Sequence, residues 1–514
     1  MMAGRLVWLR EHVWEIRFRR YIALAVALAL VAAGVWAGMT VADQRRSCAA
    51  GVSRPEGGDE CVGVATGRYD FGQRELTEVV DAIHKENRAL KKGSYVTVAI
   101  LEPFTARNPD TMGDVLHELQ GAYLAQRQAN DGPYTPRIRL VLANTGATGE
   151  HWERTVDQLA GMTGAPHHLR AVTGIGSSTD PNKAAVKELT ARGIPVIGTS
   201  ITADDLANGQ DGAENQEPYP GLARVAPTNK DLARALTSYA KISADRAYLV
   251  HDKTGDPYTR TLQASFERLV KGSRYAPATF TPPADRTEEG LTANTFRQIS
   301  LTLCGTRPTT NTILFAGRHT QLRQFVNALG EHCGDRKFTL LTGDDASYLT
   351  GDTKLDAAAL DNLTVRYTAL AHPDAWTGED PPGRGGTPSV AQRLNETVAE
   401  ERALFDEDAL DDGQLTVAYD AMTLAAHGIR EATPEGRKIP PLEQVRNEWP
   451  HINGPRLRVN GASGWICLDN HGNPYDKAVP IVELTEEREA RFLEIAWPEG
   501  RPPEQECVPP PDAS

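Results

Sequence analysis

The 514-residue sequence lacks the residue patterns of several enzyme and binding classes. It contains no CxxC pair, and its cysteines have no histidine neighbours at metal-ligand spacing, which argues against a metal centre. Acidic residues outnumber basic ones, and the formal charge of −13 argues against a nucleic-acid partner because phosphate binding requires a basic face. No internal repeat is visible. We therefore expect a globular protein without a cofactor and without nucleic acid.

The turn TGIGSST at residues 173–179 resembles a phosphate cradle but lacks what a nucleotide would need. Thr179 replaces the third glycine of the dinucleotide fingerprint, no acidic residue closes the next expected strand, and no P-loop lysine follows. The G-x-S-x-G pattern of serine hydrolases is missing here and in GASG at 461–464. We predict neither nucleotide binding nor catalysis, so the chain is expected not to be an enzyme.

An uncharged apolar run at residues 21–39 is long enough for a helix to cross the hydrocarbon core of a membrane. Arginines dominate the residues before it, which predicts that residues 1–20 stay in the cytoplasm and that the rest of the chain is extracytoplasmic. A cleaved signal peptide is the alternative, with a poor cleavage site at 40–42. We favour an uncleaved anchor and a single-pass protein of the cell membrane.

The cysteines agree with export, because all of them follow the apolar run. An even number of cysteines in an extracytoplasmic chain predicts disulfides. Cys304 and Cys333 end two expected helices that flank a single strand, so they could lie side by side. Pairing of sequence neighbours is the simplest arrangement: Cys48 with Cys61, Cys304 with Cys333, and Cys467 with Cys507.

Short apolar segments alternate with amphipathic ones along most of the chain, which predicts strands and helices in turn. Strands are expected at 95–101, 137–143, 169–175, 194–200, 246–252, 312–317 and 337–344. Helices are expected at 71–90, 111–129, 151–162, 183–193, 231–242, 258–270, 291–304 and 321–333, with a hairpin near 461–484. This order predicts an α/β fold with parallel sheets covered on both faces, in two doubly wound lobes divided near residue 225.

Ser177, Ser178 and Thr179 fall where an expected strand ends and an expected helix begins. Free N–H groups at a helix N-terminus favour an anion, and open α/β folds usually bind ligands at this end of the sheet. The alternative is a helix cap, with Asp180 at the N-cap and Pro181 at the first helical position. Both interpretations stay open at this point.

Residues 95–484 resemble the type I periplasmic binding proteins, above all the branched-chain amino-acid and amide receptors of ABC transporters. Five segments carry this resemblance in the family's order: 172–206 with its serine and threonine turns, 224–241, 247–269 with an Asp/Tyr loop, 415–429, and 461–474. The resemblance implies two lobes joined by a three-strand hinge. It places the N-terminal lobe at 93–225 and 364–455 and the C-terminal lobe at 226–363 and 456–500, after a tether and leading helix at 40–92 and before a tail at 501–514.

The same resemblance assigns a ligand site between the lobes. Ser177 and Ser178 would receive a carboxylate of the ligand, and Ser200 and Thr202 would line the same lobe. Across from them, Tyr258 would line the second lobe and Asp344, with Asp345 as the second choice, would take an ammonium group.

The sequence departs from this family at the ligand's side chain. Two places that hold aromatic residues in leucine receptors hold Met112 and either Arg318 or His319, and Gln414 and Leu415 replace a later aromatic pair. These residues argue against a branched-chain amino acid and leave two alternatives, a more polar ligand or no ligand. Arg318 is either a second contact for an anion or a solvated loop residue, and we favour the solvated loop residue.

These observations predict a membrane-tethered solute receptor that binds a small amino-acid-like ligand and delivers it to the permease of an ABC transporter. The alternative is an extracytoplasmic sensor that uses the same lobes and signals through the anchor or a membrane partner. The short cytoplasmic segment at 1–20 holds no signalling domain, which favours transport.

The anchor can be tested by fractionation of cells that make the full-length chain. We expect the protein to stay in membranes washed at alkaline pH, because an apolar helix of this length partitions into the bilayer. A soluble chain that begins near Asp43 would contradict the anchor.

Overall fold

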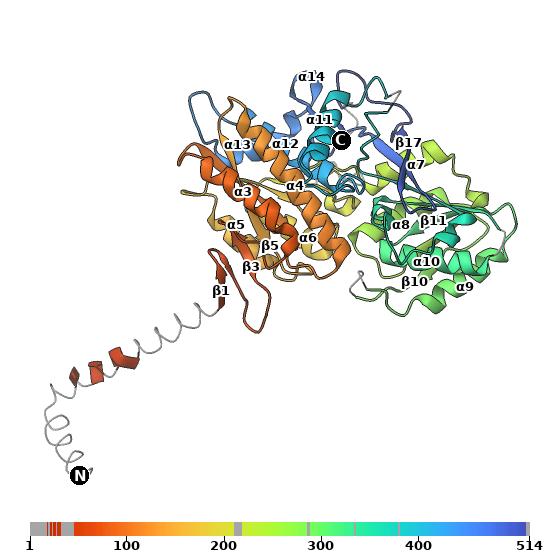
Figure 1. Ribbon diagram of the computed structural model, residues 1–514, viewed down its shortest axis with the longest axis horizontal. Coiled ribbons are helices and arrows are strands. Elements are labelled where there is room, and N and C mark those ends of the chain that lie inside the picture. The colour runs from red at the N-terminus through yellow and green to blue at the C-terminus, as the bar shows by residue number, and fades with distance from the viewer. Residues whose placement is uncertain are drawn as a thin grey trace, which may run out of the picture.

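The computed structural model describes residues 18, 21–22, 24–26, 28–31, 46–209, 218–284, 288–333, 336–378 and 381–509. It consists of two α/β lobes that lie side by side, the first built largely from the N-terminal part of the chain and the second from its middle (Figure 1).

The first lobe is built on an eight-stranded sheet in the order β1-β2-β3-β5-β4-β6-β7-β8. Its parallel strands are β4 (Tyr95–Glu102), β5 (Arg137–Asn144), β6 (Leu169–Gly174), β7 (Val196–Gly198) and β8 (Leu222–Arg224). Helices α3 (Thr77–Ala89) and α4 (Pro109–Asp131) share one apolar core with this sheet, and α5 (Trp152–Gly161) and α6 (Asp180–Ala191) share another. Both faces of the sheet are therefore covered.

The second lobe is built on a seven-stranded sheet in the order β10-β9-β11-β12-β13-β16-β17. The first five strands are parallel: β10 (Ala278–Phe280), β9 (Ala247–Asp252), β11 (Thr312–Ala316), β12 (Phe338–Thr342) and β13 (Leu363–Thr368). Strands β16 (Val479–Leu484) and β17 (Ala490–Ala496) add to it in antiparallel pairs. Its helices are α7 (Asn229–Ala240), α8 (Pro257–Leu269), α9 (Ala293–Cys304) and α10 (His319–His332), with short 3-10 turns η5 (Asp344–Leu349) and η6 (Ala357–Asp361).

In the described residues up to β17, the chain crosses between the lobes three times. It passes into the second lobe after β8, returns after β13 so that α12 (Gln414–Glu431) packs on α4, and crosses again between β15 (Gly464–Ile466) and β16. Helices α11 (Pro388–Glu400), α13 (Leu442–Arg446) and α14 (Gly454–Leu457) and strand β14 (Val459–Gly461) lie on the return. The predicted α/β fold with parallel sheets is confirmed. Because β13 pairs within the second sheet, the chain leaves that lobe after residue 368 and not at the predicted residue 364.

Local signals in the sequence explain where the helices of the site begin. Asn108 caps α4 ahead of Pro109, and Thr228 caps α7. Asp256 forms a capping box with Thr259 at the start of α8, where Pro257 needs no hydrogen-bond partner for its nitrogen. These caps fix the loops that enter the helices, and those loops face the other lobe.

The segment predicted as a tether contains structure that the sequence analysis missed. Strands β1 (Ser47–Ala49), β2 (Val52–Ser53) and β3 (Val62–Ala65) extend the first sheet, with β3 antiparallel to β5. The Cys48–Cys61 disulfide closes this hairpin, so the covalent link and the sheet edge hold a segment whose composition is polar and rich in turns. Residues 47–65 are therefore part of the lobe and not a tether.

The three disulfides join the predicted neighbours, Cys48 with Cys61, Cys304 with Cys333, and Cys467 with Cys507. In the described part of the chain, no helix has the length and hydropathy to span a membrane. The expected anchor at 21–39 falls mostly outside the described residues.

A buried carboxylate and a buried ammonium, linked through Ser463, fasten the hairpin of β14 and β15 to α12. The carboxylate of Asp420 accepts hydrogen bonds from the N–H groups of Ala462 and Ser463, at 2.7 and 2.9 Å. The ammonium of Lys477 donates to the carbonyl and hydroxyl oxygens of Ser463, both at 2.9 Å. Burial raises the pKa of Asp420 and lowers that of Lys477 to about 8, so each group depends on the charge of the other.

Replacement of Lys477 by Met should lower the free energy of unfolding by about 3 kcal/mol, because it leaves the Asp420 carboxylate buried without a cation. Urea denaturation followed by tryptophan fluorescence measures the effect. The double variant Asp420→Asn/Lys477→Met should recover part of the loss, and exposed Lys354→Met serves as the control. A Lys477→Met protein as stable as the wild type would contradict the role of the pair.

Candidate functional site

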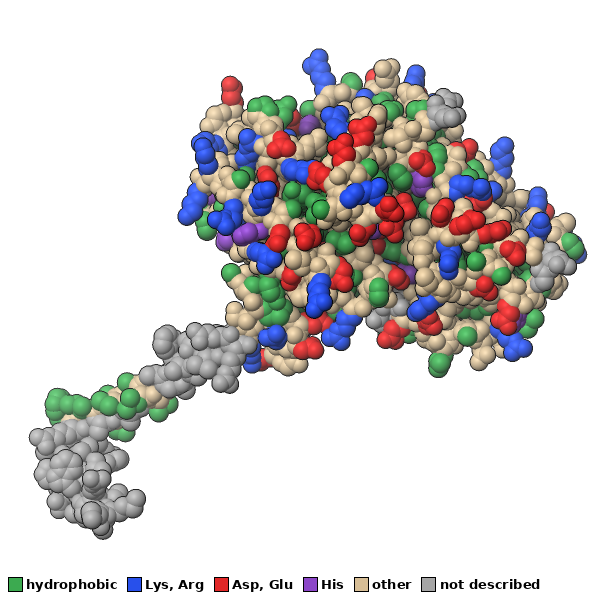
Figure 2. Space-filling model, viewed as in Figure 1, with side chains coloured by type: hydrophobic (Ala, Val, Ile, Leu, Met, Phe, Trp, Pro, Cys, Tyr) green, Lys and Arg blue, Asp and Glu red, His purple; other side chains and the backbone are tan. Residues whose placement is uncertain are grey.

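The candidate site lies where the carboxyl ends of the parallel strands of both lobes meet. On the first lobe it consists of the turns after β6 (residues 175–179) and β7 (residues 199–203). On the second lobe it consists of residues 256–258, 318–319 and 344–348. We call these segments the inter-lobe site. Acidic side chains gather over the junction of the two lobes on the face shown in Figure 2.

The glycines of the turn TGIGSST make room for two carboxyl groups of the protein itself. Gly174 has a φ of +91°, and a Cβ there would lie 2.6 Å from a carboxyl oxygen of Glu102. A Cβ on Gly176 would overlap the carboxyl of Glu118. The Gly176 N–H donates to the Glu102 carboxyl at 3.1 Å. The turn therefore accommodates carboxyl groups, but these are side chains of the protein and not groups of a ligand.

Helix α6 starts one position away from the predicted cap. Thr179 is the N-cap and its hydroxyl accepts from the Asn182 N–H at 3.3 Å, so Asp180 is the first helical residue and Pro181 the second. Thr179 takes this position because its extended backbone lets its hydroxyl reach the helix N-terminus. The prediction of Asp180 as the N-cap was wrong by one residue.

Ser178 ties the two turns of the first lobe together. It is only 2% exposed, and its hydroxyl oxygen accepts from the N–H groups of Thr202 and Ala203 at 3.0 and 3.1 Å. Its carbonyl oxygen accepts from the Tyr258 N–H at 3.4 Å across the site. Ser177 is half-buried, and no bond to its hydroxyl occurs within the described ranges.

Ser200 and Thr202 point to different partners. The Ser200 hydroxyl bonds to Gln414 and, at 3.4 Å, to Glu118, so it lies behind the site. The Thr202 hydroxyl crosses the site and donates to the Asp344 carboxyl at 3.4 Å. The structure thus brings Ser178, Thr202, Tyr258 and Asp344 together and leaves Ser200 among first-lobe residues.

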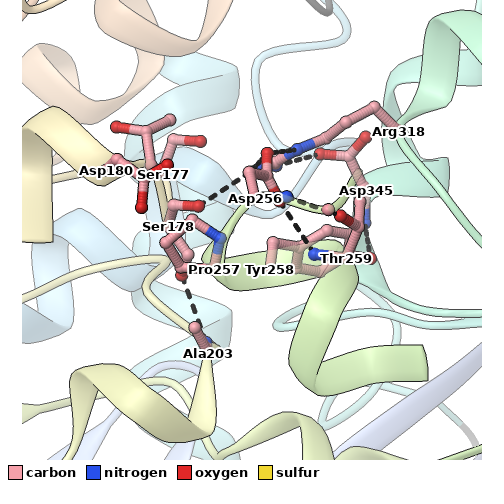
Figure 3. Close-up of polar contacts among 12 residues, drawn as sticks. Ser177, Ser178, Asp180, Ala203, Asp256, Pro257, Tyr258, Thr259, Arg318 and Asp345 are labelled. Carbon is pink, nitrogen blue, oxygen red and sulfur yellow. Dashed lines mark hydrogen bonds and ion pairs between the residues drawn. The ribbon is translucent and has the colours of Figure 1, made fainter. Parts of the chain in front are cut away.

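Arg318 is buried, contrary to the interpretation as a solvated loop residue. Its guanidinium donates to Asp256 at 2.9 Å, to Asp345 at 2.8 Å and to the Ser178 carbonyl of the other lobe at 3.0 Å (Figure 3). It also lies 4.5 Å from the ring centre of Tyr258. Two carboxylates compensate the burial of the cation, which is why an arginine is tolerated here.

The neighbouring acids Asp344 and Asp345 have opposite environments. Burial would raise the pKa of Asp345, but Arg318 and His319 hold it well below its usual range. Burial and the charge of Asp345 raise the pKa of Asp344 to about 7. Asp345 is thus fully paired, whereas Asp344 faces the first lobe without a cation bonded to it in the described structure.

Three acids of the first lobe that the sequence analysis missed also lie at the junction. Burial raises the pKa of Glu118 to about 7, and burial together with Glu118 raises that of Glu102 well above its usual range. Burial and Asp412 raise the pKa of Asp114, which bonds to Tyr348 of the second lobe. Two signals in the sequence could have identified these acids. Glu102 ends a strand of buried residues, and Glu118 lies among the buried residues of α4.

His319 adds a cation to this region. Burial opposes its charge, but hydrogen bonds with Asp110 and Asp345 raise its pKa to about 9. Its ring nitrogens lie 3.4 Å from Asp110 on α4 and 3.1 Å from Asp345. The contact of His319 with Asp110 joins the two lobes beside Arg318. The Gln414 amide also joins them, because it donates to the Tyr348 hydroxyl at 3.3 Å.

Comparison with known proteins finds this architecture in solved structures of substrate-binding proteins. No protein-family model matches the chain, and no curated protein matches it. A leucine-binding protein of Thermotoga maritima matches with a TM-score of 0.57 and 17% identity, over 79% of this chain and 100% of its own. A branched-chain amino-acid transporter substrate-binding protein of Streptococcus pneumoniae, in complex with isoleucine, matches with a TM-score of 0.56 and 15% identity, over 78% and 99%. An ABC transporter substrate-binding protein of Desulfitobacterium hafniense, in complex with Leu, matches with a TM-score of 0.56 and 15% identity, over 78% and 100%.

The raised pKa values make a prediction about pH. The folded protein keeps a proton on Asp344 and on Glu118 up to about pH 7, whereas the unfolded chain releases these protons near its ordinary carboxyl pKa. Between these values the folded state binds more protons, so stability should fall as the pH rises from 5 to 7.5. Asp344→Asn should reduce the fall by up to about 2 kcal/mol, since it removes one of these groups.

Thermal unfolding across this pH range measures the effect, with exposed Asp361→Asn as the matched control. An Asp344→Asn protein with the wild-type dependence on pH would show that Asp344 titrates normally.

Proposed function

We propose that the chain, which has the fold of the type I periplasmic binding proteins, is an extracytoplasmic solute-binding protein. It closes its two lobes on a small, amino-acid-like ligand with an ammonium group and delivers this ligand to an ABC-type importer. The solved structures with isoleucine and leucine support a ligand of this size and chemistry. The contacts at the junction then decide which residues can take part.

A single observation carries this proposal. Asp344 is a carboxyl group at the end of β12 that faces the other lobe, where the Thr202 hydroxyl is its bonded partner at 3.4 Å within the described structure. Burial favours the protonated acid, and a ligand cation would favour the carboxylate. An ammonium group placed between Asp344 and Thr202 would contact both lobes at once, so its binding would stabilise the closed arrangement.

The other residues predicted for the site have different roles in this proposal. Tyr258 holds the loop that carries Asp344, because its hydroxyl accepts a hydrogen bond from the N–H of the next residue, Asp345, at 3.2 Å. Ser178 orders the two turns of the first lobe through its hydroxyl. Ser177 has the hydroxyl that can turn to a polar group of the ligand.

A membrane tether would keep the binding protein near its permease. The apolar run at 21–39 would serve as the tether in this proposal, with the lobes outside the membrane. A sensor would use the same lobes, and genes for a permease and an ATPase next to this gene would support transport over sensing.

Titration calorimetry with an amine and amino-acid panel tests the proposal. Asp344→Asn should weaken the binding of any ligand at least about tenfold, the usual cost of a lost hydrogen bond to a charged group. Ser177→Ala should weaken it less, and remote Asp361→Asn should leave it unchanged. An affinity that Asp344→Asn does not alter would contradict the assigned site.

A further inference from the structure

Four hydrogen-bond donors of the first lobe that border the site already donate to the chain's own oxygen atoms, whereas the Ser177 hydroxyl has no bond in the described ranges. The Gly176 N–H donates to Glu102 at 3.1 Å, and the Thr199 hydroxyl donates to Glu118 at 2.8 Å. The hydroxyls of Ser200 and Thr202 donate to Gln414 and Asp344. A carboxylate entering the inter-lobe site would have to displace these acceptors, three of which are acids.

The acid that is best placed to hold a second cation is also occupied. Asp345 accepts from Arg318 at 2.8 Å and from the His319 N–H at 2.5 Å, and the His319 ring lies 3.1 Å away. The Arg318 guanidinium is nearly buried, with 11% of its side chain exposed, and its other contacts are Asp256, the ring of Tyr258 and the Ser178 carbonyl. Its charge is therefore balanced by two acids, and little of it remains for a ligand anion.

Asp344 differs from its neighbour because no basic residue bonds to it in the described part of the chain. A ligand cation can reach it by displacing one hydroxyl, that of Thr202. Asp344 can therefore pair with an ammonium group, whereas a carboxylate on the adjacent carbon would find the Ser177 hydroxyl as its one unoccupied donor among those named here.

We infer that the ligand is an amine that lacks the α-carboxylate of an amino acid, and that Arg318 restricts the second lobe to one acidic position for it. This inference rests on the proposed function, and it specifies the ligand class of that same site. Arg318 is a specificity residue here, since it fills the position at Asp345 that a second ammonium group would otherwise occupy.

Matched pairs of ligands test the inference in the full-length wild-type protein. 3-Methylbutylamine is L-leucine without its carboxylate, and 1,5-diaminopentane is L-lysine without its carboxylate. Titration calorimetry at pH 8 should show at least tenfold tighter binding of the amine in each pair. Equal or tighter binding of the amino acids, lost in Asp344→Asn, would overturn the inference and leave the proposed function standing. Binding of none of the four ligands would contradict both.

A second arm tests Arg318 itself. Arg318→Gln should raise the preference for 1,5-diaminopentane over 3-methylbutylamine at least fivefold, because Asp345 then becomes a second position for an ammonium group. Arg260→Gln is the matched control, since Arg260 also joins the lobes, through Asp205 at 3.0 Å, but at the exposed margin of the site. An unchanged preference in a folded Arg318→Gln protein, shown by a wild-type circular dichroism spectrum, would refute the role of Arg318.

Discussion

The buried guanidinium of Arg318 is the interaction on which the site depends. It neutralises Asp256 at the start of α8 and Asp345 in η5, and it bonds to the Ser178 carbonyl across the junction. Without this cation, two buried carboxylates would face each other and a first-lobe carbonyl. The same pairing leaves Asp344 as the acid of the second-lobe loops to which no cation is bonded in the described structure, so the charge that the second lobe offers a ligand follows from one arginine.

The fold forms the remainder of the site by bringing the ends of the parallel strands together. Parallel strands in both lobes end at the junction, and capped helices follow them, so short polar loops face each other. Gly174 and Gly176 let the backbone pass close to the carboxyls of Glu102 and Glu118. The glycine turn that resembles an anion site is thus packed against acids of the protein, which changes the charge that a ligand would meet there.

Much of the fold could be predicted because the alternation of apolar and amphipathic segments is strong. The strand at 169–175 and the helix at 183–193, for example, match β6 and α6 closely. The strands at 47–65 could not be predicted, because a disulfide and a sheet edge hold residues that have little hydrophobic pattern.

The site was harder to predict, since its properties depend on pairing across the lobes. The segments with Ser178, Thr202, Tyr258 and Asp344 were expected to meet, and they do. No local pattern showed that Arg318 would be buried between Asp256 and Asp345, or that Glu118 on α4 would reach the turn at Gly176. Such contacts come from residues far apart in the sequence.

The most direct test is a crystal structure of the protein grown with 3-methylbutylamine. The account predicts the ammonium nitrogen between the lobes, about 3 Å from the Asp344 carboxyl, with Arg318 still paired to Asp345. An amine bound to Asp345 with Arg318 displaced, or bound outside the inter-lobe site, would contradict it.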